Sequence, residues 1–273
     1  MTMVLFFILV ISVILGYLLF IANKNTKKVA INTISVSRPH LKVSGENLKV
    51  LHLSDMHLEN ISINPDELYE MVSEQPIDLI ALTGDFLDRK RSIPKLSAYL
   101  QALKKLNPRY GIFAVFGNHD YVLKGKNFEQ LKETLETNGC ITLQNEHFTI
   151  NVNGENLNII GIDNYSTKHS DVKKAYEGVP DGYNLVLTHD PNVVLEMENV
   201  HFDYLLSGHF HGGQIHWPKP YHLIKMGKLV RMQMVKGLHY HGGKPFYISE
   251  GLGQTGVNIR IGSRPEITFH EIS

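Results

Sequence analysis

Apolar positions along this chain form one long run at the N-terminus and many short runs after it. No charged side chain precedes Lys24, and residues 4–21 are almost entirely Leu, Ile, Val and Phe. Later, short apolar runs typical of buried strands alternate with segments whose apolar residues recur at helical spacing. These runs predict strands over residues 48–53, 78–83, 111–116, 157–162, 185–188, 204–207, 246–249 and 267–272.

Helical periodicity falls mainly between the first strands. It predicts helices over residues 65–74, 93–106, 128–138 and 171–177. Asn64 is the expected N-cap of the first helix, with Pro65 at its first helical position. Residues 141–164 are expected to be β-structure, with a hairpin turn at Asn153-Gly154. Because helices alternate with strands early and strands dominate later, the pattern predicts an α/β fold of mixed sheets flanked by helices.

The N-terminal apolar run has the length of a membrane span, since roughly 20 helical residues cross a hydrocarbon core. A cleaved signal peptide is one alternative, but residues 1–3 carry no basic side chain and residues 18–22 contain no Ala-x-Ala. A buried helix of a soluble protein is another. We therefore expect a transmembrane anchor over residues 1–23, a tether and first strand over 24–46, and one folded domain over 47–273.

Charge and composition bear on the membrane orientation, the partners and the disulfide bonds of the protein. Positive residues favour the cytoplasmic side of a membrane, so a single-pass protein with a cytoplasmic domain is expected from Lys24, Lys27 and Lys28. The 273 residues carry a formal net charge of zero, which argues against nucleic acid as a partner. The one cysteine, Cys140, cannot form an internal disulfide. The sequence leaves the oligomeric state open.

Five of the apolar runs end in metal-binding residue types. The segments are Ser54-Asp55-Met56-His57, Thr83-Gly84-Asp85, Gly117-Asn118-His119-Asp120, Thr188-His189-Asp190 and Gly208-His209-Phe210-His211. Residues two apart on a strand face the same way, so Asp55 and His57 can reach one ion. Mixed Asp, Asn and His ligands suit first-row divalent cations. Core histidines and polar turns are the alternative, but each of the five ends would then carry its ligand by coincidence.

The order of these motifs resembles the calcineurin-like metallophosphoesterase superfamily over about residues 48–272. The resemblance implies a four-layer α/β/β/α sandwich with two divalent metals at the strand ends, expected to be Mn²⁺, with Zn²⁺, Fe²⁺ or Mg²⁺ as alternatives. It implies that one metal is held by Asp55, His57, Asp85 and His211. It implies that the other is held by Asp85, Asn118, His189 and His209. His119 would sit over the substrate phosphate, oriented by Asp120.

Residues 208–215 and Gly251-Leu252-Gly253 resemble a bacterial membrane-associated subgroup of this superfamily, which includes phosphodiesterases and UDP-2,3-diacylglucosamine hydrolases. The expected reaction is hydrolysis of a phosphodiester or pyrophosphate bond of a lipid or nucleotide-lipid, by attack of a hydroxide that bridges the two metals. A tethered phosphodiesterase or phosphatase for soluble substrates is the alternative enzyme. A catalytically dead binding scaffold is the non-enzymatic alternative.

Residues 204–249 contain no Asp or Glu but many Lys, Arg and His residues, interleaved with apolar ones. Such a stretch beside the metals would attract an anionic substrate with an apolar part, or anionic lipid headgroups; a solvated basic loop is the alternative. Candidate substrate contacts are Asp163, Lys225, Arg231 and His239. A turn cap at Asp163 and a polar loop carrying His239 and His241 are the competing interpretations. His52 is expected to be a packed strand residue.

Overall fold

Two six-stranded sheets lie face to face in the computed structural model, which describes residues 2–37, 47–152 and 154–273. The first sheet is mixed, because its third to sixth strands run parallel while the second is antiparallel to the third. Its strands, in spatial order, are β1 (Ala30–Val36), β12 (Glu266–Ile272), β2 (Leu48–Leu53), β3 (Leu79–Thr83), β4 (Ile112–Val115) and β5 (Cys140–Thr142).

The second sheet is also mixed, with parallel strands at its centre and an antiparallel strand at each edge. Its strands, in spatial order, are β10 (Gly237–His241), β11 (Lys244–Ile248), β9 (Tyr204–Ser207), β8 (Tyr183–Leu187), β7 (Glu155–Gly161) and β6 (Glu146–Val152). The last two form the expected hairpin, with Val152 opposite Glu155. Asn153 of the expected turn lies outside the described residues.

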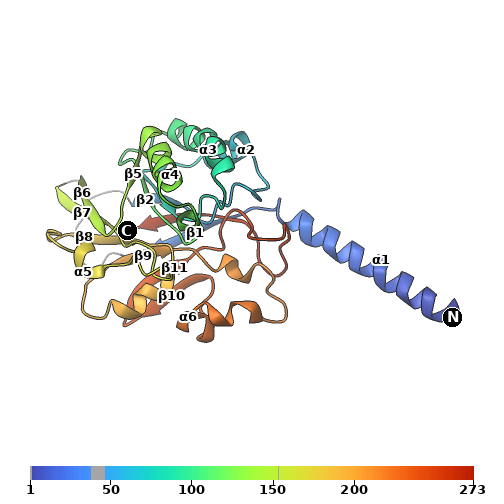
Figure 1. Cartoon of the computed structure of the whole chain (residues 1–273). Helices are drawn as coiled ribbons and strands as arrows, with labels where there is room; N and C mark the ends of the chain where they lie inside the picture. Colours follow the sequence, from blue (N-terminus) through green and yellow to red (C-terminus); the bar gives the residue numbers. More distant parts are fainter. Residues whose placement is uncertain (1, 38–46, 153) are drawn as a thin grey trace.

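Helices cover the outer faces of both sheets (Figure 1). The first sheet carries α2 (Pro65–Val72), α3 (Ile93–Lys105) and α4 (Lys126–Thr137). The second carries α5 (Val172–Ala175), α6 (Lys228–Arg231) and the 3-10 helices η3 (Pro191–Glu196) and η5 (Tyr221–Lys225). The four-layer α/β/β/α sandwich expected from the sequence is therefore confirmed.

Three apolar clusters fill the three interfaces between these layers. In β3, Ile80 faces the helices while Leu79 faces the other sheet, because successive strand residues point to opposite faces. In β8, Val186 packs under the second helical layer and Leu185 between the sheets. Strands buried on both faces explain why the sequence shows continuous apolar runs here instead of alternation.

Local signals account for both ends of α2. Asn64 accepts hydrogen bonds from the backbone N–H groups of Asp66 and Glu67 at 2.9 Å, and Glu67 closes the capping box, so the predicted start of α2 is confirmed. The helix ends at Val72, two residues before the predicted end. Gln75 N donates to Val72 O at 3.3 Å, and Pro76 has no N–H group that could extend the helical hydrogen bonds further.

Strand β10 was not predicted, and it corrects the expectation that His239 and His241 lie on a polar loop. Its residues are half-buried or exposed, so no buried apolar run marks it in the sequence. Pairing with β11, with His239 opposite Phe246, makes it an edge strand. His52 lies fully buried inside β2, as expected for a packed strand residue.

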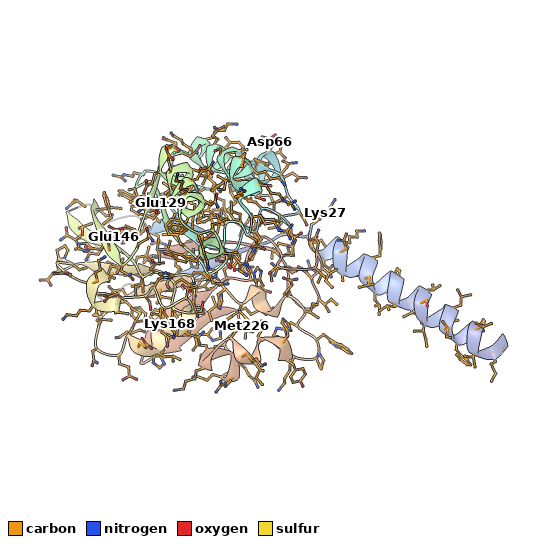
Figure 2. All side chains as sticks on the ribbon, in the orientation of Figure 1. Lys27, Asp66, Glu129, Glu146, Lys168 and Met226 are labelled. Atoms are coloured by element: carbon orange, nitrogen blue, oxygen red, sulfur yellow. The ribbon has the colours of Figure 1, made fainter. Side chains whose placement is uncertain are left out.

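The N-terminal helix α1 (Thr2–Asn25) projects away from the two sheets, and its apolar side chains stand clear of them (Figures 1 and 2). Residues 3–25 are long and apolar enough to cross a membrane, with a mean hydropathy of 3.1 and none of that window buried. The helix runs to Asn25, and β1 follows within the segment expected to be a tether and first strand. Residues 38–46 of that segment lie outside the described residues.

Candidate metal centre

The loops that follow five strands meet at one edge of the sandwich. Strands β2, β3 and β4 are parallel neighbours, as are β8 and β9, so their carboxyl ends lie together. The loops are hydrogen-bonded to one another: Asp55 N donates to Gly84 O at 2.9 Å, and Gly208 N donates to His189 O at 3.0 Å. Side chains from distant parts of the chain are thereby brought into one buried cluster.

The backbone at this edge is strained where the predicted ligands stand. Residues with a side chain rarely adopt positive φ, since Cβ then crowds the carbonyl oxygen. Positive φ values occur at Asp55 (49°), His57 (38°), Asp85 (54°), His209 (78°) and His211 (50°). Such strain concentrates at functional sites, where the surrounding structure holds it in place.

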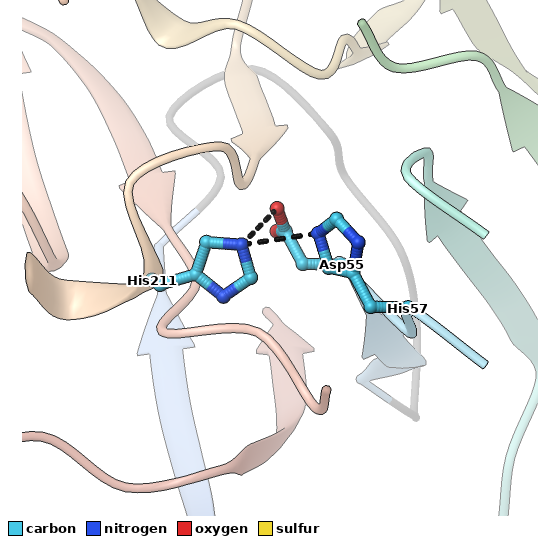
Figure 3. Close-up of side chains that lie close together, drawn as sticks. All are labelled: Asp55, His57 and His211. Carbon is cyan, nitrogen blue, oxygen red and sulfur yellow. Dashed lines mark hydrogen bonds and ion pairs between the residues drawn. The ribbon is translucent and has the colours of Figure 1, made fainter. Parts of the chain in front are cut away.

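Asp55, His57 and His211 form the first group of possible ligands (Figure 3). Nε2 of His211 lies 3.3 Å from Oδ1 of Asp55 and 3.2 Å from Nε2 of His57. All three residues are buried. His57 donates its other ring N–H, Nδ1, to Oδ1 of Asp88 at 3.0 Å, which leaves Nε2 facing the group as a metal ligand requires.

Asp85, His189 and His209 form the second group. Nε2 of His189 lies 3.2 Å from Oδ2 of Asp85 and 3.2 Å from Nδ1 of His209. The Nδ1–H group of His189 donates to the Thr83 carbonyl at 2.7 Å, so its Nε2 is again free to face the group. Oδ2 of Asp85 also lies 3.5 Å from Nε2 of His57. One carboxylate therefore stands between the two groups.

Asn118 supplies an independent test of whether these residues fit metal ions. Its Oδ1 is buried and has no hydrogen-bond partner among the described residues, a costly state for a polar atom. It lines a cavity of about 530 Å³ together with Asp85, His119 and His209. An amide oxygen that faces carboxylates and imidazoles completes a donor set suited to first-row divalent cations.

Asp120 corrects the expected orientation of His119. The carboxylate of Asp120 accepts backbone N–H groups of Asp85 at 2.9 Å, Phe86 at 2.9 Å and Gly117 at 2.8 Å. The Asp120 side chain thus links the loop after β3 to the loop after β4. The partner of His119 is Asp88, whose Oδ1 lies 2.9 Å from the His119 Nδ1. Asp88 lies only three residues after Asp85, and this closeness to a predicted ligand is the one sequence signal for it. The predicted motif Thr83-Gly84-Asp85 does not include it.

Buried charges around the centre shift its pKa values in opposite directions. Burial alone would lower the pKa of His189, but the carboxylates of Asp85 and Asp55 raise it to about 10. Burial likewise works against His119, yet Asp88 and Asp85 raise its pKa to about 9. Burial raises the pKa of the Asp85 carboxyl. The nearby rings of His189 and His57 lower it by more, so the net pKa of Asp85 lies well below the usual range of an aspartate.

Two glycines allow the loops to approach so closely. A β-carbon on Gly117 would overlap the Asp85 carboxylate, and one on Gly208 would overlap the Ser54 hydroxyl. Both positions require glycine because there is no room for a β-carbon. Backbone conformation does not require it, since neither residue has positive φ. The motif glycines are therefore part of what places the carboxylates.

The four candidate substrate contacts lie in different parts of the molecule. Lys225 lines a cavity of about 680 Å³ that Asn118 and His209 also line. Arg231 lines a separate cavity of about 430 Å³. Asp163 is buried, where it accepts the Tyr121 hydroxyl at 2.5 Å and the N–H of the next residue at 2.7 Å. Nε2 of His239 lies 2.9 Å from the carbonyl of Lys236 on the far edge of the second sheet.

Arg260 is a buried cation that the sequence did not single out. Its guanidinium donates to the carbonyl groups of His211 at 2.9 Å, Glu250 at 2.8 Å, Gly251 at 3.0 Å and Gly253 at 2.7 Å. Burial lowers the pKa of Arg260 to about 10, so it remains charged at neutral pH. It joins the loop that carries His211 to the loop that packs against Asp55. A lone Arg between Ile259 and Ile261 carries no motif, so only the structure identifies it.

Residues 48–213 match the model of the calcineurin-like phosphoesterase family. Together with the converging ligand groups, this match places the chain in a class of metal-dependent phosphoester hydrolases. The chain belongs to the calcineurin-like phosphoesterase family.

Its relatives carry names that agree with this family. Bacillus subtilis YkoQ, named a metallophosphoesterase, is 66% identical over 254 residues, covering 93% of this chain and 94% of that one. Escherichia coli YaeI, named a phosphodiesterase, is 29% identical and covers 82% of each chain. A bovine transmembrane protein with a metallophosphoesterase domain is 29% identical and covers 88% of this chain and 56% of its own.

Divalent metal should stabilise the protein through Asp85. A ligand that binds only the folded state at 100 times its Kd adds about 2.7 kcal/mol, so Mn²⁺ or Zn²⁺ should raise the melting temperature of chelator-treated protein. Because metal must displace the proton on His189, the rise should be larger at pH 8 than at pH 6.5. Asp85→Asn should lose most of the rise, whereas the exposed control Asp181→Asn should keep it. An equal rise in Asp85→Asn would contradict the shared carboxylate.

Loss of the Arg260 guanidinium should weaken both the fold and the metal centre. Arg260→Met keeps an unbranched apolar stem but leaves four carbonyl groups without their donor, at about 1–3 kcal/mol for each one that stays buried. Urea unfolding should therefore show a loss of at least about 3 kcal/mol, and dialysis should remove metal faster. The exposed Arg264→Met is the matched control. Similar losses of stability and of bound metal in both variants would show that the Arg260 guanidinium does not specifically stabilise the metal centre.

Proposed function

We propose that the two ligand groups hold two divalent cations, with Mn²⁺ as the first choice, and that the enzyme cleaves a phosphodiester or pyrophosphate bond between them and His119. The observation that carries this proposal is the position of Asp85. Its Oδ2 lies 3.2 Å from the His189 ring and 3.5 Å from the His57 ring, within reach of both groups. Two bound cations acidify an attacking water and neutralise charge on the phosphoryl oxygens.

The chain's own residues divide the remaining work. The cations would be held by Asp55, His57, Asp85, Asn118, His189, His209 and His211. Asp120 keeps the Asp85 backbone in place through three N–H groups from two loops. Its role in this proposal is therefore positional.

His119 acts as the proton donor in this proposal. Against the effect of burial, Asp88 and Asp85 raise the pKa of His119, which favours its protonated form, and its side chain is only partly buried at the rim of the cavity. A positioned acid of this kind donates a proton to the oxygen that leaves the phosphorus. Asp88 fixes the direction of the ring, because Oδ1 of Asp88 holds Nδ1 and leaves Nε2 for the substrate.

His119→Gln should lose turnover while keeping metal. Removal of a general acid typically costs about 100- to 10,000-fold, so hydrolysis of bis-p-nitrophenyl phosphate with Mn²⁺ should fall by that range at unchanged metal content. His209→Ala, in contrast, should lose both activity and metal, as measured by elemental analysis. The same assay on the wild type separates an enzyme from a scaffold. Metal loss in His119→Gln before activity loss would assign His119 to the ligands instead.

The substrate in this proposal is amphipathic, and the enzyme acts at the membrane that α1 spans. The cavity over the ligands is walled on one side by the apolar residues Leu223, Met226 and Val257. Helix α1 is long and apolar enough to cross a membrane, and a bovine relative is named a transmembrane protein. The lysines after α1 favour a domain on the cytoplasmic side. A phosphodiester or pyrophosphate on a lipid or nucleotide-lipid fits these features together.

A direct comparison of substrates tests this finer part. The full-length protein in mixed micelles should hydrolyse UDP-2,3-diacylglucosamine with a kcat/KM at least about tenfold above that for a nucleotide diester without acyl chains, since about 1.4 kcal/mol of apolar contact gives that factor. Val257→Asp, at an exposed residue of the same cavity wall, should remove most of the difference and leave the rate on the soluble diester nearly unchanged. Equal kcat/KM values would favour a tethered enzyme for soluble substrates.

A further inference from the structure

Apolar side chains are exposed together on one surface of the domain. Outside α1, nine large hydrophobic residues of the described chain are exposed, and five belong to residues 217–232 or to the loop at Val257. They are Trp217 (76% exposed), Tyr221 (63%), Val257 (59%), Ile224 (55%) and Met232 (43%). We call these five residues the apolar rim. Exposed apolar groups gathered in this way are typical of a surface that meets a partner or a membrane.

Basic side chains stand among the residues of the apolar rim. They are Lys219, Lys225, Lys228 and Arg231, all exposed, and none forms an ion pair with another described residue. No acidic residue occurs anywhere in residues 204–249. Unpaired cations beside exposed Trp and Tyr match the headgroup region of an anionic bilayer, where aromatic rings sit at the interface and cations meet lipid phosphates.

A chain of hydrogen bonds joins the base of α1 to the loops that carry the rim. The Asn23 side chain donates to Asn258 O at 2.7 Å, and Arg260 N donates to Ala22 O at 2.9 Å. His216 N, one residue before Trp217, donates to Ile261 O at 2.6 Å. In Figure 1 the red segment of these loops reaches the base of α1.

This junction is packed and not merely tethered. Ala22 is only 2% exposed and Thr26, directly after α1, only 1%, although residues 3–20 of α1 are all exposed. Thr26 also accepts a hydrogen bond from the Ser62 hydroxyl at 2.7 Å. The end of α1 is therefore fixed to the domain, so a bilayer spanned by α1 has its surface near Val257 and Trp217.

We propose that the apolar rim and its four cations dock into the headgroup layer of an anionic bilayer on the side where α1 ends. The inference rests on the proposed membrane anchoring. The 3-10 helix η5 gives docking a consequence for the active site. Its residues Tyr221 and Ile224 line an outer cavity, while His222 and Leu223 line the cavity over the metal ligands. Docking thus brings the mouth of the metal centre to the level of lipid headgroups.

Trp217 is the one tryptophan in the chain and reports directly on docking. Full-length protein is reconstituted into phosphatidylcholine vesicles with or without phosphatidylglycerol, using acyl chains brominated near the glycerol. Docking predicts a blue-shifted emission and strong quenching by brominated lipid, both greater with phosphatidylglycerol. Lys219→Glu/Ile224→Glu should lose most of the quenching. Lys90→Glu/Arg91→Glu, at exposed positions before α3, should keep it.

Vesicle flotation separates the two levels of the proposal. Protein that fails to float with vesicles would contradict the anchoring by α1. Protein that floats but keeps a red, unquenched Trp217 emission would overturn docking alone. A blue shift that follows protein concentration without bromine quenching would assign the rim to a second copy of the chain and overturn docking too. Turnover of a soluble diester by Lys219→Glu/Ile224→Glu shows that the variant is folded.

Discussion

One buried carboxylate governs the architecture of this protein. Asp85 must lie between two imidazole groups that come from opposite sheets, because His57 follows β2 of the first sheet and His189 follows β8 of the second. This is possible only if two sheets face each other and their strands end at the same edge. A charge buried so completely is tolerable only with partners of opposite sign at hydrogen-bond distance. The sandwich can thus be understood as the means of bringing those partners together.

The ligand loops are held by the backbone as much as by side chains. Asp120 gathers three N–H groups from two loops, and Arg260 gathers four carbonyl groups from two others. The buried carboxyl group of Asp120 thus accepts backbone N–H groups, and the buried guanidinium of Arg260 donates to carbonyl groups, of the loops around the ligands. Both offset the strain of the positive-φ ligand positions, which no unsupported loop would keep.

Sequence reasoning predicted the layers and the clustering well, because both depend on local signals. Apolar runs gave the buried strands, and each ligand stands directly after one of them. Contacts between distant segments were beyond its reach. Asp120 and Asp88 lie near the same motifs, and only distances show that the second one meets His119. Strand β10 was missed because an edge strand buries too little to leave an apolar run, and Arg260 because its partners are carbonyl groups, which no side-chain pattern records.

Arg260 also joins α1 to the candidate metal centre. Arg260 uses its backbone N–H to bind Ala22 at the end of α1 and its guanidinium to bind the carbonyl of His211. Arg260 thus connects α1 to His211, a proposed metal ligand, through two hydrogen bonds. A flexible tether would let the domain turn freely over a membrane, whereas this junction gives it one orientation. Under the proposed anchoring, that orientation turns the cavity mouth, lined by Val257, toward the bilayer, and a substrate confined to the membrane would meet it at high local concentration.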